Sequence, residues 1–77
     1  MMKLQTGAPI QINCPSGAEH RYPAFHAAFH GRAGRVLAIE PRGAAGVIQV
    51  DVSREGEAGV WINVARDWLS HAEGKRT

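Results

Sequence analysis

Four side chains in the first half of the chain are of the types that bind transition metals. Cys14 is followed by His20, His26 and His30, and the last two histidines lie four residues apart. Two histidines at this spacing on one helix can share an ion, and a thiolate with imidazoles suits zinc. The intervals between the four residues nevertheless match no established zinc module, because such modules carry their ligands in tight pairs. We therefore expect no metal site and no bound cofactor, and we place the histidines at the edge of a helical turn.

The same cysteine would act as a nucleophile only if a base activated it. Cys14 is the single cysteine of the chain, and His20 is the nearest histidine in sequence. Activation requires the base within hydrogen-bond reach and a third group that orients the base. No motif here fixes that geometry, and a small thiol in a loop or a core is the commoner case. The sequence thus predicts no catalytic machinery within one chain.

Length and composition limit the class of protein. The chain has 77 residues and a formal net charge of +2. A domain of this size buries only about 60% of its unfolded surface, so association with a partner or a second copy would help to stabilise it. The lone cysteine and the lack of a signal peptide or long apolar run indicate a cytoplasmic protein without a membrane partner. A strong nucleic-acid footprint would show a more one-sided charge.

Alternating apolar residues predict a series of short strands. In the segment 47–52, Ile48, Val50 and Val52 share one face. In the segment 60–64, Val60 and Val64 repeat this pattern. The predicted strands are residues 9–13, 35–40, 47–52 and 60–64.

Helical turns and loops are predicted between these strands. Residues 14–23 are rich in Pro, Ser and Gly and indicate a loop. Residues 24–30 favour one or two helical turns with Phe25 and Phe29 on one inward face, and Gly31 is a plausible stop.

The end of the chain predicts a closing turn. Residues 65–72 favour a short helix or 3₁₀ turn with Trp68 in the core and a strand residue or two at Leu69, and Asn63 is a candidate cap. These elements predict an all-β fold, a small barrel of four to five strands with a helical turn before the second strand. Closure of the barrel would remove its exposed edges. The expected domain spans residues 9–72, with a flexible arm over 1–8 and a flexible tail over 73–77.

The run "GRAGRVLAIEPRGAAGVIQVDV" from Gly31 to Val52 resembles the KOW-type, SH3-like barrels of ribosomal and transcription-factor proteins. The pattern is a glycine, two residues and a second glycine, Gly34, which would let the chain bend sharply into the strand. The ending "GVWINVARDWL" resembles the closing strand and 3₁₀ turn of other SH3-like barrels. Among these are barrels of nitrile hydratase β-subunits and the type II dihydrofolate reductases, whose ligand-facing strand matches Val60–Asn63. The resemblance implies an SH3-like barrel, which marks a fold rather than a function.

Trp61 is the most informative single residue for function. Its neighbours Val60 and Ile62 should point inward, so Trp61 should point outward. An exposed tryptophan on a strand often marks a contact surface, although the segment 14–30 or the N-terminal arm would equally well cover it. Asn63, Tyr22 and Phe25 are the other candidates for this surface.

Three arginines flank the first glycine-rich bend and the proline turn. Loops at one end of a barrel would bring Arg32, Arg35 and Arg42 together as a polar rim or a phosphate-binding patch. Alternatively they are solvated turn residues, some of them paired with Glu40, Glu55 or Glu57.

Three functions fit this sequence. The first is a non-catalytic binding or accessory module that docks a protein partner or self-associates through its aromatic strand. The second is RNA or DNA binding by a KOW-like face. The third is an enzyme whose site forms only in a symmetric oligomer, like the type II dihydrofolate reductases.

Overall fold

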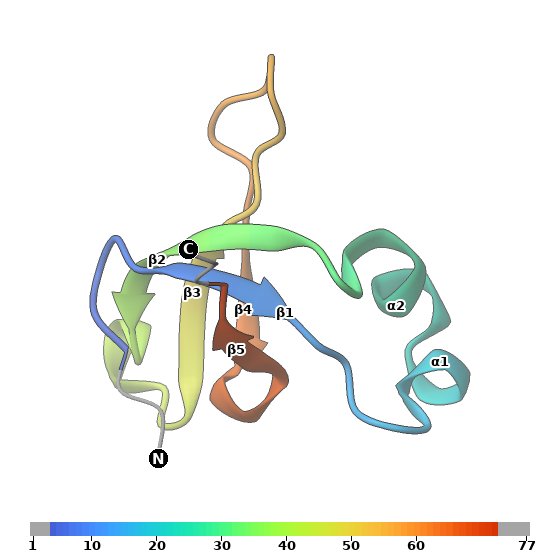
Figure 1. Cartoon of the computed structure of the whole chain (residues 1–77). Coiled ribbons are helices and arrows are strands. Elements are labelled where there is room, and N and C mark those ends of the chain that lie inside the picture. Colours follow the sequence, from blue (N-terminus) through green and yellow to red (C-terminus); the bar gives the residue numbers. More distant parts are fainter. Residues whose placement is uncertain (1–3, 73–77) are drawn as a thin grey trace.

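The computed structural model describes residues 4–72, and these residues form a mostly β fold. Five strands are joined by two small helices, α1 and α2, and two 3₁₀ turns, η1 and η2 (Figure 1). In chain order the elements are β1 (Pro9–Ile12), α1 (Ala18–Arg21), α2 (Pro23–Phe29), β2 (Ala33–Ile39), η1 (Pro41–Gly43), β3 (Val47–Asp51), β4 (Trp61–Ala65), η2 (Arg66–Trp68) and β5 (Leu69–His71). All four strands expected from the alternation are present, and the short segment after Trp68 is a fifth.

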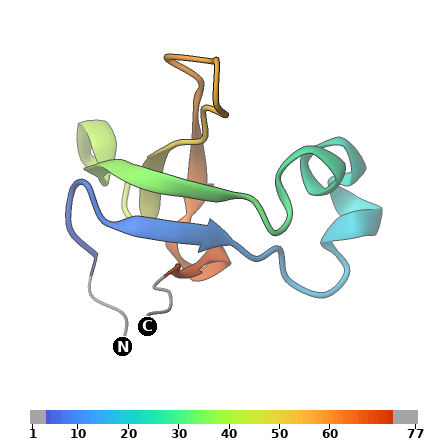
Figure 2. The same ribbon diagram turned by 45° about the horizontal axis from the view of Figure 1, so that its top comes forward.

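The five strands form one antiparallel sheet in the order β4-β3-β2-β1-β5. The first strand of the chain lies between β2 and the last strand, β5, as Ile10 pairs with Gly34 on one side and with His71 on the other. β1 and β2 run side by side, and α1 and α2 lie together beyond one end of this pair (Figure 2). The two helices are four and seven residues long, and no helix within residues 4–72 is long and apolar enough to cross a membrane.

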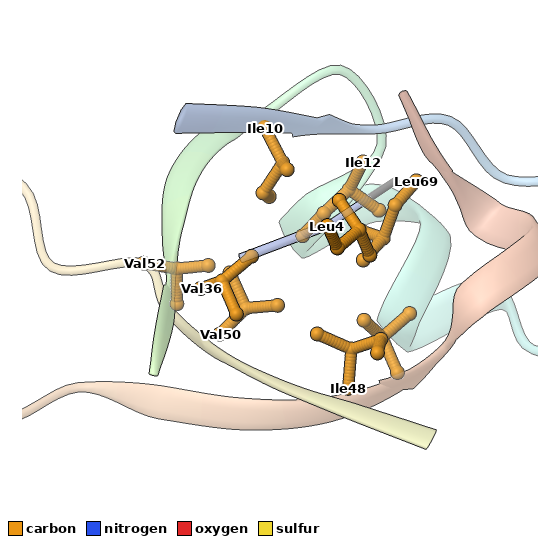
Figure 3. Packing of buried hydrophobic residues seen from close by; sticks show 9 residues of the cluster. Leu4, Ile10, Ile12, Val36, Ile48, Val50, Val52 and Leu69 are labelled. Carbon is orange, nitrogen blue, oxygen red and sulfur yellow. The ribbon is translucent and has the colours of Figure 1, made fainter. Parts of the chain in front are cut away.

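The core contains only aliphatic side chains. On β3 the predicted alternation is confirmed, because Ile48 and Val50 are fully buried while Val47, Gln49 and Asp51 are partly exposed. Side chains from all five strands and from the N-terminal segment form one buried cluster, and those labelled in Figure 3 point toward one another in the interior. The buried cluster is Leu4, Ile10, Ile12, Val36, Ile48, Val50, Val52, Val64 and Leu69.

The N-terminal segment contributes to this core. Leu4 is 7% exposed, and the Gly7 N–H donates a hydrogen bond to the Val36 carbonyl. The described part of the expected N-terminal arm therefore packs against the sheet. The expected C-terminal tail, 73–77, lies outside the described residues.

Gly34 has a different role from the predicted bend. It lies inside β2, and a Cβ atom there would be 2.5 Å from the carbonyl oxygen of Asp51 and 2.9 Å from Cγ1 of Val50. The glycine is thus required by the close approach of β3 to β2, which sequence reasoning could not see because the contact joins distant segments. The turn in the chain comes earlier, at Gly31, whose φ of 80° lies in the left-handed region.

Two local predictions were wrong. The predicted loop over residues 14–23 contains the four-residue helix α1, which follows Gly17 with its φ of 92°. Asn63 does not cap the closing turn, because pairing with β3 continues to Ala65 and η2 begins only after that residue. The predicted helix over 24–30 is confirmed by α2, with Pro23 at the first turn.

Candidate binding surface

Three aromatic rings from separate parts of the chain meet where the helices approach η2. The Trp68 ring lies 5.9 Å from that of Tyr22 and 5.5 Å from that of Phe25, measured between centroids. Phe29 extends the cluster, since its ring centroid is 5.0 Å from that of Phe25. Distances of this size, with tilted or edge-on rings, are those that aromatic pairs prefer.

Local structure explains how each ring reaches this position. Tyr22 is the residue between α1 and α2, where a helix-breaking φ of −134° turns the chain, and Pro23 starts the next helix. Phe25 and Phe29 are four residues apart on α2, so they share the face that packs on the core cluster. Trp68 ends η2 and is partly buried against the same cluster. The prediction that Trp68 belongs to the core is thus confirmed for one side of its ring only.

A cavity of about 220 Å³ opens between these rings and the end of β4. The side-chain amide of Asn63 is the polar group in a lining that is otherwise mainly apolar. We call this cavity the aromatic pocket, and its lining residues are Tyr22, Phe25, Asn63, Val64, Ala65 and Trp68. Three of the residues predicted for binding, Tyr22, Phe25 and Asn63, therefore come together in one place.

Trp61 lies on the outer face of β4, as predicted. Its exposed fraction is 52%, and Asn63 and Ala65 are exposed on the same face, while Val64 is buried and Ile62 is partly buried. Segment 14–30 therefore leaves half of this side chain open to solvent. Side chains on one face of a strand repeat every second residue. Trp61 is therefore the outward-facing neighbour of Asn63, which lines the pocket.

The three predicted arginines do not come together. Arg32 donates a hydrogen bond to the carbonyl oxygen of Val52 and forms an ion pair with Glu57 at 3.5 Å. Arg35 donates to the carbonyl oxygen of Gly7 at 3.1 Å. Arg42 lies in η1, beyond the other end of β2, a strand whose seven residues span roughly 20 Å.

Two separate hollows reflect this division of the arginines. Arg32 lines one of about 550 Å³ together with His30 and Arg54, and Arg35 lines another of about 390 Å³ together with Asp51. The ion pair between Arg32 and Glu57 agrees with the second of the two predictions for the arginines, in which they are turn residues and some of them pair with acids.

The cysteine and the histidines form a local structural contact. The Cys14 backbone N–H donates to Nδ1 of His30 at 3.0 Å, and the rings of His26 and His30 stack with centroids 4.5 Å apart. His20 instead faces Glu19 at 3.7 Å. Within residues 4–72, no group of three or more His, Cys, Asp or Glu side chains is placed to hold a metal ion.

The cysteine is also poorly suited to nucleophilic attack. Burial raises the pKa of the Cys14 thiol, so the protonated form predominates at neutral pH. Its contact with His30 runs through the backbone N–H, which does not activate the sulfur.

Sequence reasoning missed three members of the candidate site, Val64, Ala65 and Trp68. Trp68 was assigned to the core from its position beside Leu69, and its second, solvent-facing side depends on α1 and α2, which lie far away in sequence. One feature of the sequence could have indicated that Trp68 belongs to the site. It lies in the closing turn that directly follows the strand with the outward-facing Trp61. Comparisons with protein-family models, with curated proteins and with solved structures give no match for this chain.

Proposed function

We propose that this chain is a non-catalytic binding module with an SH3-like barrel fold, and that its aromatic pocket binds an apolar side chain of a protein. The observation that carries the proposal is the convergence of three rings and one amide on a single open cavity. Aromatic residues around one oriented polar group are typical of sites that hold a partner's anchor residue.

The fold part of the proposal rests on topology. β1 pairs with both β2 and β5, so the first and last strands are neighbours. The closing strand and the 3₁₀ turn implied by the SH3-like resemblance of residues 59–69 correspond to β4 and η2, and β5 follows directly. These features support a partly open barrel whose sheet wraps around the aliphatic core and leaves β4 at an edge.

The size of the pocket supports a protein ligand. Small-molecule sites usually enclose about 300–1,000 Å³, and the aromatic pocket, at about 220 Å³, is smaller. A cavity of this size suits one side chain projecting from a larger partner. Nucleic-acid binding has less support, because Arg32 and Arg35 are engaged within the fold and Arg42 lies apart from them.

The test uses peptides of defined sequence. A displayed library of random peptides is selected on the immobilised domain, and the binding of each selected peptide is measured by fluorescence polarisation. We expect the peptides to share an apolar or aromatic residue, and we expect Tyr22→Ala to weaken their binding at least tenfold, about 1.4 kcal/mol. Tyr22 is 52% exposed, so its truncation should leave the fold intact.

Leu37→Ala is the matched control, because Leu37 is also a large exposed apolar residue but lies on β2, outside the pocket. Peptide binding should be the same in this variant and in the parent protein. If no peptide is selected, or if binding ignores Tyr22→Ala, the proposed function is wrong.

A further inference from the structure

Within residues 4–72, the main chain of β4 pairs with another strand on one side only. The Val52 N–H donates to the Val60 carbonyl, and the Arg66 N–H donates to the Gly46 carbonyl. Because hydrogen-bonding direction alternates along a strand, the even-numbered residues of β4 face β3. The main-chain groups of Trp61, Asn63 and Ala65 therefore point the other way, and β4 pairs with no strand but β3 in the described part of the chain.

This edge lacks the features that usually protect a strand from pairing with another chain. Proteins block such edges with charged side chains, prolines or bulges. The segment from Val60 to Ala65, "VWINVA", contains no charge and no proline, and its register with β3 is continuous. An uncharged edge rich in β-branched and aromatic residues favours addition of a further strand.

The outward side chains of β4 are complementary to a second β4 in antiparallel orientation. With a two-fold axis through Asn63, the two Asn63 residues face each other, and Trp61 of each copy lies opposite Ala65 of the other. A side-chain amide carries both donors and an acceptor, so it can pair with its own copy. Ala65 is small and also lines the aromatic pocket, so the facing indole is placed at the pocket's mouth.

We propose that the pocket's occupant is a second copy of this chain: two β4 strands pair antiparallel, and Trp61 of each copy enters the aromatic pocket of the other. This inference rests on the proposed function, since it identifies the partner that the same pocket binds. Trp61 is the natural anchor because it shares the highest exposed fraction, 52%, among the large apolar side chains described, and the other such residue, Tyr22, lines the pocket itself.

Side-chain pairing favours this register over its neighbour. Moving the axis by one residue, to Ile62, would place Trp61 of each copy opposite Asn63 of the other, away from Ala65 and the pocket. With the axis at Asn63, no charged residues face each other within the paired strands, and Arg66, the first residue beyond β4, comes opposite the uncharged Val60. This register therefore places Trp61 at the pocket without opposing like charges.

The expected dimer is weak. A fully buried tryptophan covers about 150–250 Å². Because Trp61 is 52% exposed in one chain, the two reciprocal indoles lose only roughly 150–250 Å² of their own surface, against the about 1,200–2,000 Å² typical of stable interfaces. The paired strands add to this area but are only five residues long. Dimerisation should therefore depend on protein concentration.

Sedimentation velocity over a wide range of protein concentration tests the inference. We expect the parent chain to shift from monomer to dimer as its concentration rises, and we expect Trp61→Ala to weaken dimerisation at least tenfold. Asn63→Asp should weaken it as well, because two carboxylates would then face each other at the axis. Leu37→Ala is the control and should dimerise like the parent chain.

A cross-link tests the register itself. Opposed residues of a hydrogen-bonded antiparallel pair have Cα atoms about 5.5 Å apart, within the range that a disulfide spans. In a Cys14→Ser background, which removes the only other thiol, Asn63→Cys should form a covalent dimer on mild oxidation, and Leu37→Cys should not.

The outcomes separate the two proposals. A chain that stays monomeric at every concentration, or a dimer unaffected by Trp61→Ala, would overturn the inference, and peptide binding that is sensitive to Tyr22→Ala would still uphold the proposed function. A concentration-dependent dimer that is lost in Trp61→Ala and cross-linked through position 63 would establish the second copy as the occupant.

Discussion

The interior of the sheet and the aromatic pocket are built from different kinds of side chain. Every residue of the buried cluster is aliphatic, from Ile10 at 0% exposure to Leu69 at 7%. The chain's aromatic residues all lie outside that fully buried set: Phe25, Phe29 and Trp68 pack against it from one side, and Tyr22 and Trp61 are half exposed. The aliphatic set therefore holds the sheet together, whereas the aromatic set packs on the outside of this core and keeps part of its surface exposed.

Removing volume from the aliphatic core should have the largest effect on stability. Ile48 is fully buried in the middle of β3, so Ile48→Ala should lower the free energy of unfolding by about 2–5 kcal/mol through lost burial and the cavity left behind. Small domains have only about 5–15 kcal/mol in total, so much of this chain would unfold. Urea denaturation followed by circular dichroism measures the change, and an effect no larger than that of the exposed Leu37→Ala would contradict the assignment of Ile48 to the core.

Truncation within the aromatic cluster should have a smaller effect. Phe25→Ala removes contacts with Phe29 and Trp68, but the ring is only partly buried, so the expected loss is about 1–2 kcal/mol rather than the about 3–5 kcal/mol of a fully buried phenylalanine. The same denaturation experiment measures it. A loss equal to that of Ile48→Ala would mean that the aromatic and aliphatic sets form one core.

The smallest effect is expected at Asp51, on the outer face of the sheet. Its carboxylate accepts a hydrogen bond from the Ser53 backbone N–H at 2.8 Å, and this bond, together with one from the Ser53 hydroxyl, lowers the pKa of Asp51. A carboxyl with a lowered pKa stabilises the fold above its unfolded-state pKa of about 3.9, and the stabilisation is lost as the pH falls through the folded-state value.

Asp51→Asn should therefore melt at a lower temperature than the parent chain near neutral pH. Below the unfolded-state pKa of about 3.9 the gap should narrow. Thermal melting over a pH series measures this difference in melting temperature between the two proteins. A difference that is the same at every pH would show that the hydrogen bond does not favour the charged form of Asp51.

Much of the sheet was predictable because strand alternation is a local signal. The inward positions of β3 and the outward position of Trp61 follow from the period of two, and both are found in the structure. The role of Gly34 was not predictable, since it depends on the carbonyl of Asp51, a residue on another strand. Helix α1 was missed because one turn of four residues has too little pattern to stand out from a Pro-, Ser- and Gly-rich segment.

The candidate site was predictable in its residue types but not in its grouping. Tyr22, Phe25 and Asn63 were selected from the sequence and line one pocket, yet Trp68, which contacts two of the rings, was assigned to the core. The arginines were grouped by their position near turns. They separate because Arg32 and Arg42 flank opposite ends of an extended strand.

The position of β1 in the sheet has a consequence for how the protein folds. β1 pairs with β5 in the sheet. One of the two strands next to residues 9–12 is therefore formed by residues 69–71, about sixty residues later in the sequence. A contact between segments so distant in sequence requires closure of nearly the whole chain, and such contacts slow folding. During synthesis β1 therefore emerges well before β5, and the edge of β1 that pairs with β5 stays open until β5 has left the ribosome.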